Sequence, residues 1–208
     1  MYSHKPARVN RRETISDLEN FTARKDDYLD EESPLLAMKG IIRARAAMKP
    51  ISVGHEMIQE AASASQIFEL QCSGGHYSFL PVDSGARNMP LTDGAFLFVV
   101  LANDPGRIYC GVPYGSSAAH PDFSISGHTS LTYRADALYA GEIFFSHGTL
   151  LSWNNGSGHY KPAAALRDVN LIPAVRRLLP DDRFIDYWSM SMQQAREQLT
   201  MRGYTVME

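Results

Sequence analysis

The spacing of apolar residues changes twice along this chain, and each change indicates a different kind of secondary structure. Near the N-terminus, Leu35, Met38 and Ile41 recur at helical spacing, which predicts a helix that begins at Ser33-Pro34 and ends before Pro50. A second helix is predicted over residues 55–70, where apolar residues continue on one helical stripe. The first part of the chain is therefore expected to be helical.

The middle of the chain has the composition and spacing of strands. Residues 95–102 form an uninterrupted apolar run, and a turn at 103–106 separates them from a second strand at 107–112. This pattern predicts a β-hairpin whose first strand is buried on both faces. A second hairpin is predicted from strands at 137–145 and 149–153, and residues 127–132 are interpreted as a short strand.

Residues 171–178 and 188–199 return to helical spacing, with Gly203 as the expected C-cap of the last helix. Because the strands form hairpins and do not alternate with helices, we expect an α+β fold with a mainly antiparallel sheet, flanked by N-terminal and C-terminal helices. Residues 1–32 are polar and lack an apolar period, so we expect a flexible N-terminal arm, either a solvated extension or an export signal. Residues 33–208 are expected to form a single domain.

Composition narrows the class of protein. Apolar residues make up 44% of the 208 positions, enough for one core, and 20 Lys and Arg against 23 Asp and Glu give a net charge of −3. This near balance argues against a nucleic-acid binder. Two cysteines, Cys72 and Cys110, are too few for a disulfide scaffold, and no C-x-x-C pair or other spacing predicts a metal site. The longest apolar run is far shorter than the ~20 residues that span a bilayer, so we expect a cytoplasmic protein without a membrane span.

Histidines beside glycines are the candidates for chemistry. His128 and Ser130 lie at i and i+2, which on an extended chain would place both side chains on one side, as a nucleophile and its base require. Glu142, on the next predicted strand, could orient an imidazole or act as a base itself. In the alternative interpretation His128 is a hydrogen-bonded structural residue, Ser130 is a sheet hydroxyl and Glu142 faces solvent.

A second candidate is the segment Ser157-Gly158-His159-Tyr160, which ends a predicted hairpin just before a helical segment. Backbone N–H groups at such a position could bind an anion such as a phosphate. His159 adds a group that titrates near neutral pH, and Tyr160 adds a hydroxyl and an aromatic surface. No Walker motif and no Gly-x-Ser-x-Gly elbow occurs. Cys110 is typical of a small buried hydrophobic residue, with a thiol nucleophile as the alternative.

The order of these short sequence motifs along the chain resembles that of a known domain. It is similar to the C-terminal half of plant IQ-motif-containing calmodulin-binding proteins and to C-terminal domains of bacterial polymorphic toxins and secreted effectors. The short motifs of that family are His-Ser-Ser-Phe, Ala-Gly-(Glu/Arg) and Ser-Gly-His-Tyr-(Arg/Lys)-Pro. The matching segments, within roughly residues 67–180, are Phe96–Val100 with Ile108–Gly111, His128–Leu131, Ala140–Ile143 with Gly148–Leu150, and Ser157–Pro162. Thr129 and Leu131 replace the family's Ser and Phe. The resemblance implies that one site is lined by His128, Ser130, Gly141, Ser157, Gly158, His159 and Tyr160, but it supplies no reaction.

Residues and resemblance together predict an enzyme-like effector or toxin domain, which acts by group transfer or hydrolysis on a nucleotide-like or protein substrate. The expected catalytic residues are His128, Ser130, Glu142, His159 and Tyr160, and the expected ligand-binding residues are Ser157, Gly158 and Gly141. One version is an ADP-ribosyltransferase, which would use NAD. His128-Thr-Ser130 and Glu142 match only partly the Ser-Thr-Ser strand and the distal Glu that such enzymes usually have. Such a domain could be delivered to a host cell by a specialised secretion system.

Two alternatives remain open at this point. The chain could be a non-catalytic binding module for a protein partner such as calmodulin, through the basic helix with Lys39, Arg43, Arg45 and Lys49. Residues 41–45 lack the Gln and the spaced Arg-Gly of an IQ motif, so this partner does not follow from the resemblance. In the third interpretation, the motifs with histidine and tyrosine are purely structural and only hold the hairpins together.

Overall fold

The computed structural model describes residues 34–54, 59–85 and 89–202. Contacts divide the chain into two units, Met1–Ile42 and Arg43–Glu208, and the second contains the whole sheet. The predicted arm over residues 1–32 and the predicted cap Gly203 lie outside the described residues. Within them, no helix has both the length and the hydropathy needed to cross a membrane.

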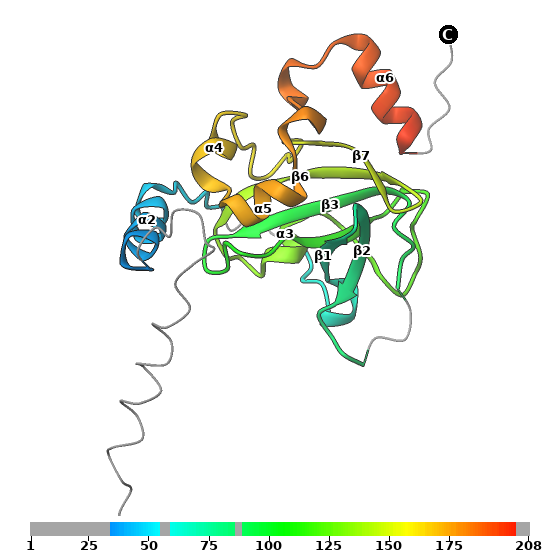
Figure 1. The fold of residues 1–208 in the computed structure, drawn as a ribbon. Helices are drawn as coiled ribbons and strands as arrows, with labels where there is room; N and C mark the ends of the chain where they lie inside the picture. The colour runs from blue at the N-terminus through cyan, green and yellow to red at the C-terminus, as the bar shows by residue number, and fades with distance from the viewer. Residues whose placement is uncertain (1–33, 55–58, 86–88, 203–208) are drawn as a thin grey trace, which may run out of the picture. The chain divides into compact units, whose positions relative to one another are not determined.

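Among the described residues, eight strands form one sheet, with the order β2-β1-β4-β3-β6-β7-β8 and with β5 paired to β4 (Figure 1). Neighbouring strands are antiparallel except for the parallel pairs β4–β5 and β7–β8. The prediction of a mainly antiparallel sheet is therefore confirmed. The strands are β1 Phe68–Ser73, β2 His76–Pro81, β3 Gly94–Leu101, β4 Tyr109–Pro113, β5 Ser124–Ile125, β6 Ala137–Ser146, β7 Thr149–Asn154 and β8 Phe184–Ile185.

The described α-helices are mostly short. Within the predicted helical segment 171–178, Pro173 occupies the first turn of the helix, where its missing N–H removes no hydrogen bond. The flanking arrangement of the first helix stays a prediction, because this helix lies across the boundary between the two units. The helices are α2 Pro34–Ala47, α3 His128–Thr132, α4 Leu166–Asn170, α5 Pro173–Leu178 and α6 Met192–Met201.

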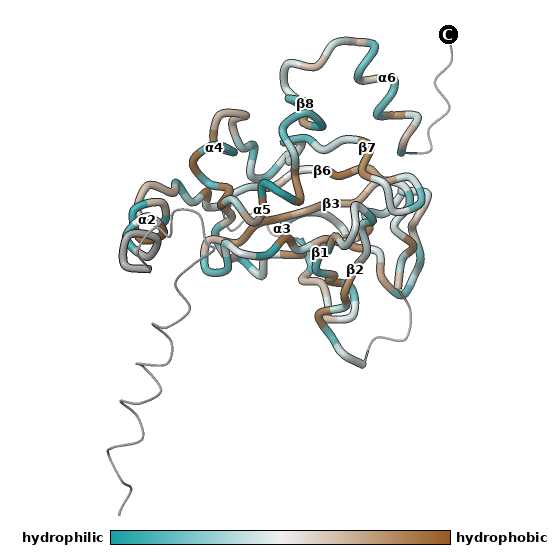
Figure 2. Tube along the Cα trace, in the orientation of Figure 1, coloured by the Kyte–Doolittle hydropathy of each residue, from teal (hydrophilic) through white to brown (hydrophobic). Residues whose placement is uncertain are grey.

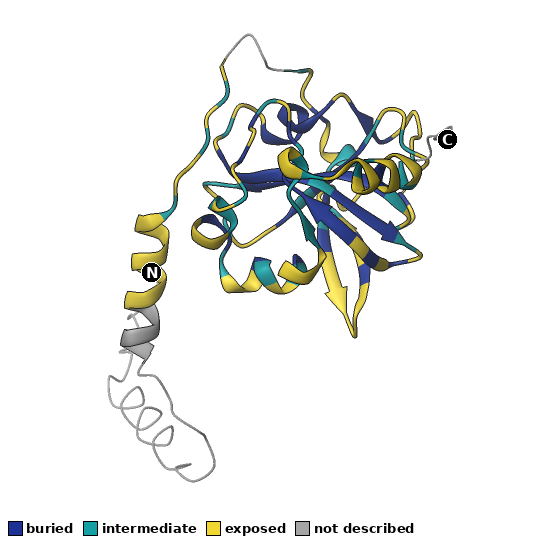
Figure 3. Ribbon diagram, turned by 90° about the horizontal axis from the view of Figure 1, so that it is seen from above, coloured by how far each residue is buried: buried dark blue, intermediate teal, exposed yellow. Residues whose placement is uncertain are grey.

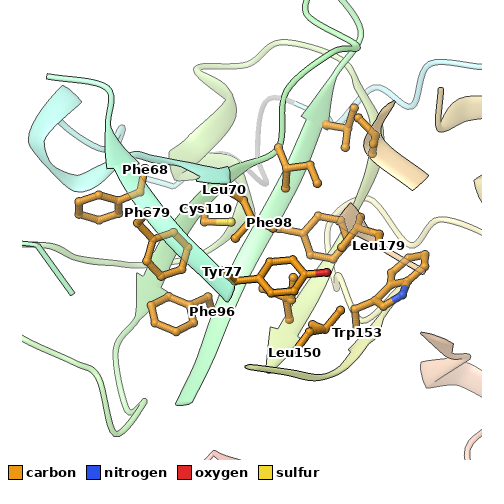
Figure 4. Close-up of a cluster of buried hydrophobic side chains, with 14 of the residues drawn as sticks. Phe68, Leu70, Tyr77, Phe79, Phe96, Phe98, Cys110, Leu150, Trp153 and Leu179 are labelled. Atoms are coloured by element: carbon orange, nitrogen blue, oxygen red, sulfur yellow. The ribbon is translucent and has the colours of Figure 1, made fainter. Parts of the chain in front are cut away.

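Strand β3 lies near the middle of the sheet and is buried on both faces, as its unbroken apolar run predicts. Phe96 and Phe98 join a large aromatic cluster on one face (Figure 4), whereas Leu97 and Val99 join a smaller cluster on the other. Burying a side chain of this size contributes about 1.5–3 kcal/mol. Hydrophobic residues accordingly follow strand β3 in Figure 2, and Figure 3 shows buried residues along strands of the sheet.

Both predicted hairpins are present. Leu97 pairs with Gly111 between β3 and β4, and Phe144 pairs with Ser152 between β6 and β7. The smaller core cluster contains the compact residues Ala62, Ala137 and Ala140, which leave room for α3 to lie against the sheet. At Gly111 an added Cβ would come within 2.4 Å of the end of the Ile125 side chain, which would have to shift to make room.

The predicted helix over residues 55–70 is wrong in its described part. Residues 59–63 are irregular and Ala64–Gln66 form a single 3-10 turn. Strand β1 then begins at Phe68, because Phe68 and Leu70 both point into the core when the backbone is extended. The helical spacing in the sequence therefore arose by coincidence across a loop and a strand, and residues 55–58 of the predicted helix lie outside the described residues.

The predicted strand over residues 127–132 is also wrong, because His128–Thr132 form the helix α3. Its start is held by Gln59, whose side chain donates to the Ser126 carbonyl (2.9 Å) and accepts from the Thr129 hydroxyl (2.9 Å). A Cβ on Gly127 would lie 2.3 Å from this amide. The helix is therefore fixed by a residue far away in the sequence, which local periodicity cannot detect.

The last helix begins later than predicted. Residues Tyr187–Ser189 form a separate 3-10 turn, and Asp186 accepts the backbone N–H of Trp188 at its start. Ser191 then caps α6 in a capping box with Gln194.

Candidate functional site

Two of the sequence segments that contain a candidate histidine lie in contact in the fold. The Tyr160 hydroxyl donates either to the Thr132 hydroxyl, at 2.9 Å, or to the Ala135 carbonyl, at 3.1 Å. Thr132 is the last residue of α3, which begins at His128. The segment from Ser157 to Tyr160 is therefore fastened to α3, although about thirty residues separate them in the sequence.

His128 is the first residue of α3 and is 5% exposed. Its Nε2 lies 2.8 Å from the carbonyl oxygen of Gly141 on β6. A carbonyl can only accept a hydrogen bond, so Nε2 must carry the proton, and in the neutral ring Nδ1 then has a free lone pair. Burial lowers the pKa of His128, although the Gly141 carbonyl and the charge of Glu142 act in the opposite direction. At neutral pH the ring is therefore neutral and its tautomer is fixed.

His159 belongs to the same neighbourhood. This half-buried imidazole interacts electrostatically with His128, and its positive charge lowers the pKa of the His128 ring further. Of the predicted site residues, the fold brings together His128, Gly141, Glu142, His159 and Tyr160.

Glu142 lies on β6 directly opposite Leu97 of β3 and so faces the same side of the sheet as the smaller core cluster. Its Oε2 accepts hydrogen bonds from the Arg202 guanidinium and from Asn154 Nδ2, the latter at 3.2 Å. The sequence left open whether Glu142 faces solvent or acts on an imidazole. In the structure its charge is paired, and its one described effect on His128 is electrostatic.

Ser130 does not point the same way as His128, and the expectation based on an extended chain is wrong. Residues at i and i+2 of a helix lie about 200° apart around its axis. No hydrogen bond joins the two side chains, and within the described part of the chain the buried Ser130 Oγ has no partner at all. The nucleophile–base pair suggested by the spacing is therefore not formed in this conformation.

The anion site expected at Ser157-Gly158 is not built as predicted. No helix follows Tyr160 directly, since α4 begins at Leu166. The Ser157 N–H donates to the Asn155 carbonyl (2.9 Å) and the Tyr160 N–H donates to Ser157 Oγ (3.3 Å), so these donors already have partners. Gly158 is exposed, and a Cβ there would meet nothing within 4 Å.

Gly141 has a structural reason to be glycine. A Cβ at this position would lie 1.9 Å from the backbone oxygen of Asn154 on β7. The close approach of the two strands, which also presents the Gly141 carbonyl to His128, therefore excludes any side chain. The structure therefore gives Gly141 a packing role, and its expected role in ligand binding stays a prediction.

Sequence reasoning missed the buried asparagines that hold this region. Asn154 Oδ1 accepts the N–H groups of Glu142 (3.1 Å) and Gly156 (2.7 Å), and its Nδ2 donates to Gln198 on α6 (3.0 Å). Asn155 in turn donates to the Pro162 carbonyl (3.0 Å). The available signal was the Asn154-Asn155 pair directly before the Gly-Ser-Gly-His segment, which on local pattern alone is typical of the end of a hairpin.

The surroundings of Glu142 do not fit NAD. The cavity lined by Glu142 and Arg202 has a volume of about 90 Å³, the space of about three waters at ~30 Å³ each. The carboxylate that would have to approach the nicotinamide ribose is occupied by Arg202 and Asn154. The geometry therefore gives no support to an ADP-ribosyltransferase step at this residue.

Two further candidates can be placed. Cys110 is fully buried, and burial raises the pKa of its thiol, so it behaves as the small hydrophobic residue of the first interpretation and not as a thiolate nucleophile. Within residues 34–54, 59–85 and 89–202, no group of three His, Cys, Asp or Glu side chains is arranged to hold a metal ion.

Comparison with known proteins adds no relative. No protein-family model matches the sequence, and neither the curated proteins nor the solved structures contain a match. The resemblance to the calmodulin-binding and toxin domains therefore stays a prediction.

Proposed function

We propose that this chain is an enzyme domain of the effector or toxin type, in which His128 is the general base and His159 is the second proton-transfer group. The single observation that supports it is the state of His128: a neutral, buried imidazole with Nε2–H held by Gly141, Nδ1 unprotonated, and a second imidazole close enough to affect its charge. A general base needs an unprotonated nitrogen in a fixed orientation.

In the proposed reaction, Nδ1 of His128 accepts the proton of an attacking water or hydroxyl group. The positive charge that develops on the ring is stabilised by the Gly141 carbonyl at Nε2 and by the nearby Glu142. His159, in its protonated form, gives a proton to the leaving group. One imidazole thus accepts a proton while the other donates one, as hydrolysis or group transfer requires.

The proposed substrate is a nucleotide-like or protein molecule, and the resemblance to secreted effector domains supports delivery to a host cell. The proposal does not use Ser130 as the nucleophile, because Ser130 and His128 diverge around α3. Tyr160 acts as a positioning residue, since its hydroxyl fixes the segment with His159 to α3.

The test is growth of bacterial and eukaryotic cells that express the full chain. His128→Gln keeps an amide that can donate to Gly141 but removes the basic nitrogen, and His159→Ala removes the second imidazole. Both variants should relieve toxicity while their unfolding midpoints stay close to that of the parent protein. His147→Ala, at an exposed histidine elsewhere, is the matched control and should stay toxic. Toxicity that survives both site variants, or a parent protein that is harmless in both hosts, would refute the proposal.

A binding module is the second candidate, and one observation favours it. The described part of α2 exposes Ile41 and Ile42, at 62% and 60%, and all charged side chains of this helix are basic. A basic helix with exposed apolar residues is typical of a calmodulin target. A pull-down with calmodulin, with and without calcium, tests it: Arg43→Glu with Arg45→Glu should abolish capture, and capture that ignores both charge and calcium excludes this function.

A further inference from the structure

Helix α6 is amphipathic, but its apolar side does not face the sheet. The sequence places Trp188, Met192 and Leu199 on one helical stripe. In the structure these residues are 52%, 76% and 38% exposed, and within α6 the one buried residue is Gln198. Figure 1 shows α6 standing away from the strands along most of its length. Burial of apolar surface, which holds most helices against their domain, therefore contributes little to the docking of α6.

The contacts that dock α6 are polar and come from its last turn. Gln198 Oε1 accepts a hydrogen bond from Asn154 Nδ2 at 3.0 Å, and the guanidinium of Arg202, directly after the helix, pairs with Glu142. The Met201 sulfur adds a weak hydrogen bond with β7, at 4.0 Å. The buried Nε2 of Gln198 has no partner within the described part of the chain, which weakens the docking. So few contacts allow α6 to open locally while the rest of the domain stays folded.

The docked position of α6 affects the candidate site because Arg202 compensates the charge of Glu142. That charge favours the protonated form of His128, whereas burial of the ring and the charge of His159 oppose protonation. When α6 detaches, Glu142 loses its cation and acts on the imidazole unopposed. A protonated His128 cannot accept a proton as a general base. The state of α6 therefore changes the fraction of the protein in which His128 can act.

We propose that α6 is a detachable latch, which keeps His128 available as a base while it is docked and switches the base off when it opens. The inference rests on the proposed function, since it assigns a regulator to the same site. Opening loses polar contacts that water can replace and exposes little new apolar surface, so the open state is accessible. Arg202 is a positioning residue, which acts on the imidazole through Glu142.

Native-state hydrogen exchange of the full chain tests the latch without any assay of activity. The backbone amides of residues 196–201 should exchange through local opening, faster than those of β6, which open only with the whole domain. Arg202→Gln removes the ion pair and should speed exchange in α6 about tenfold. Arg196→Gln removes the same charge from an exposed position of the same helix and should change nothing. Exchange of α6 only through global unfolding would overturn the proposal.

Titration of the His128 ring, followed through its nitrogen signals, tests the link between the latch and the site. Arg202→Gln should raise the pKa of His128, and Arg196→Gln should leave this pKa unchanged. In a Glu142→Gln background, Arg202→Gln should have little effect on the ring, because the carboxylate that transmits the charge is gone. A pKa that does not move in Arg202→Gln, or that moves equally without Glu142, would refute the link.

Growth of the expressing cells separates this inference from the proposed function. Arg202→Gln should be less toxic than the parent protein, whereas Arg196→Gln should be as toxic as the parent. A toxic parent with an equally toxic Arg202→Gln would refute the latch and leave the proposed function standing. A harmless parent would refute the proposed function, and the exchange and titration results would still decide whether α6 opens and acts on His128.

Discussion

Asn154→Ala is the substitution whose effect can be worked out most fully from the structure. The side chain is completely buried and accepts the N–H groups of Glu142 at 3.1 Å and of Gly156 at 2.7 Å. Its Nδ2 also donates to Glu142 and Gln198. Alanine would leave two partly buried backbone donors without partners, at about 1–3 kcal/mol each. We therefore expect a loss of about 2–6 kcal/mol, a large part of the ~5–15 kcal/mol that stabilises an ordinary domain.

The measurement is urea unfolding of the full chain, analysed from the midpoint at constant m-value. Gln193→Ala, at an exposed residue of α6, is the control and should change stability by less than about 0.5 kcal/mol. A loss below about 1 kcal/mol for Asn154→Ala would mean that water replaces the amide oxygen, and the reasoning about this network would be wrong. Because Gly156 begins the segment that contains His159, the same variant should also relieve toxicity in the cell assay.

The remaining predictions concern the pH dependence and the packing of the site. Because burial lowers the pKa of folded His128 below its ordinary ~6.5, the unfolded chain binds this proton more readily, so stability from this residue is complete above about pH 6.5 and is lost as the pH falls. His128→Gln should therefore lose less stability than the parent between about pH 7 and 5 in urea unfolding. Gly141→Ala should cost more than about 3 kcal/mol or prevent folding, since its Cβ would lie 1.9 Å from the Asn154 carbonyl, and a soluble variant with an unchanged melting curve would contradict this. Tyr160→Phe should cost about 0.5–1.5 kcal/mol by removing the hydrogen bond to Thr132, and an unchanged denaturation midpoint would show that the bond adds nothing.

Local patterns were enough to predict some of the strands. The hairpins β3–β4 and β6–β7 combine continuous apolar residues with strong turns, and both signals come from neighbouring positions. The hairpin β1–β2 was missed because the start of β1 lies within the helix predicted over residues 55–70, and the turn at Gly74 and Gly75 was not used. In the structure both have positive φ, 59° and 82°, which is the backbone of a tight hairpin turn.

The candidate site was predictable only in part, because local patterns show the segments of the site and not their distant partners. The sequence motifs that contain His128 and His159 were recognisable, and the fold brings the two histidines together. The partners that fix their chemistry come from elsewhere: Gln59 holds the start of α3, and Arg202 pairs with Glu142 from 60 positions further along the chain. Such contacts depend on the folded topology, and no spacing in a single sequence encodes them.

The contact between Arg202 and Glu142 has a practical consequence for anyone who handles this protein. Helix α6 places a cation on the carboxylate nearest to His128 and buries Gln198 beside Asn154. We expect a purification tag or fluorescent fusion placed after Arg202 to disturb its contact with Glu142, so a loss of toxicity in such a preparation would not by itself count against the proposed site. Labels belong at the opposite terminus.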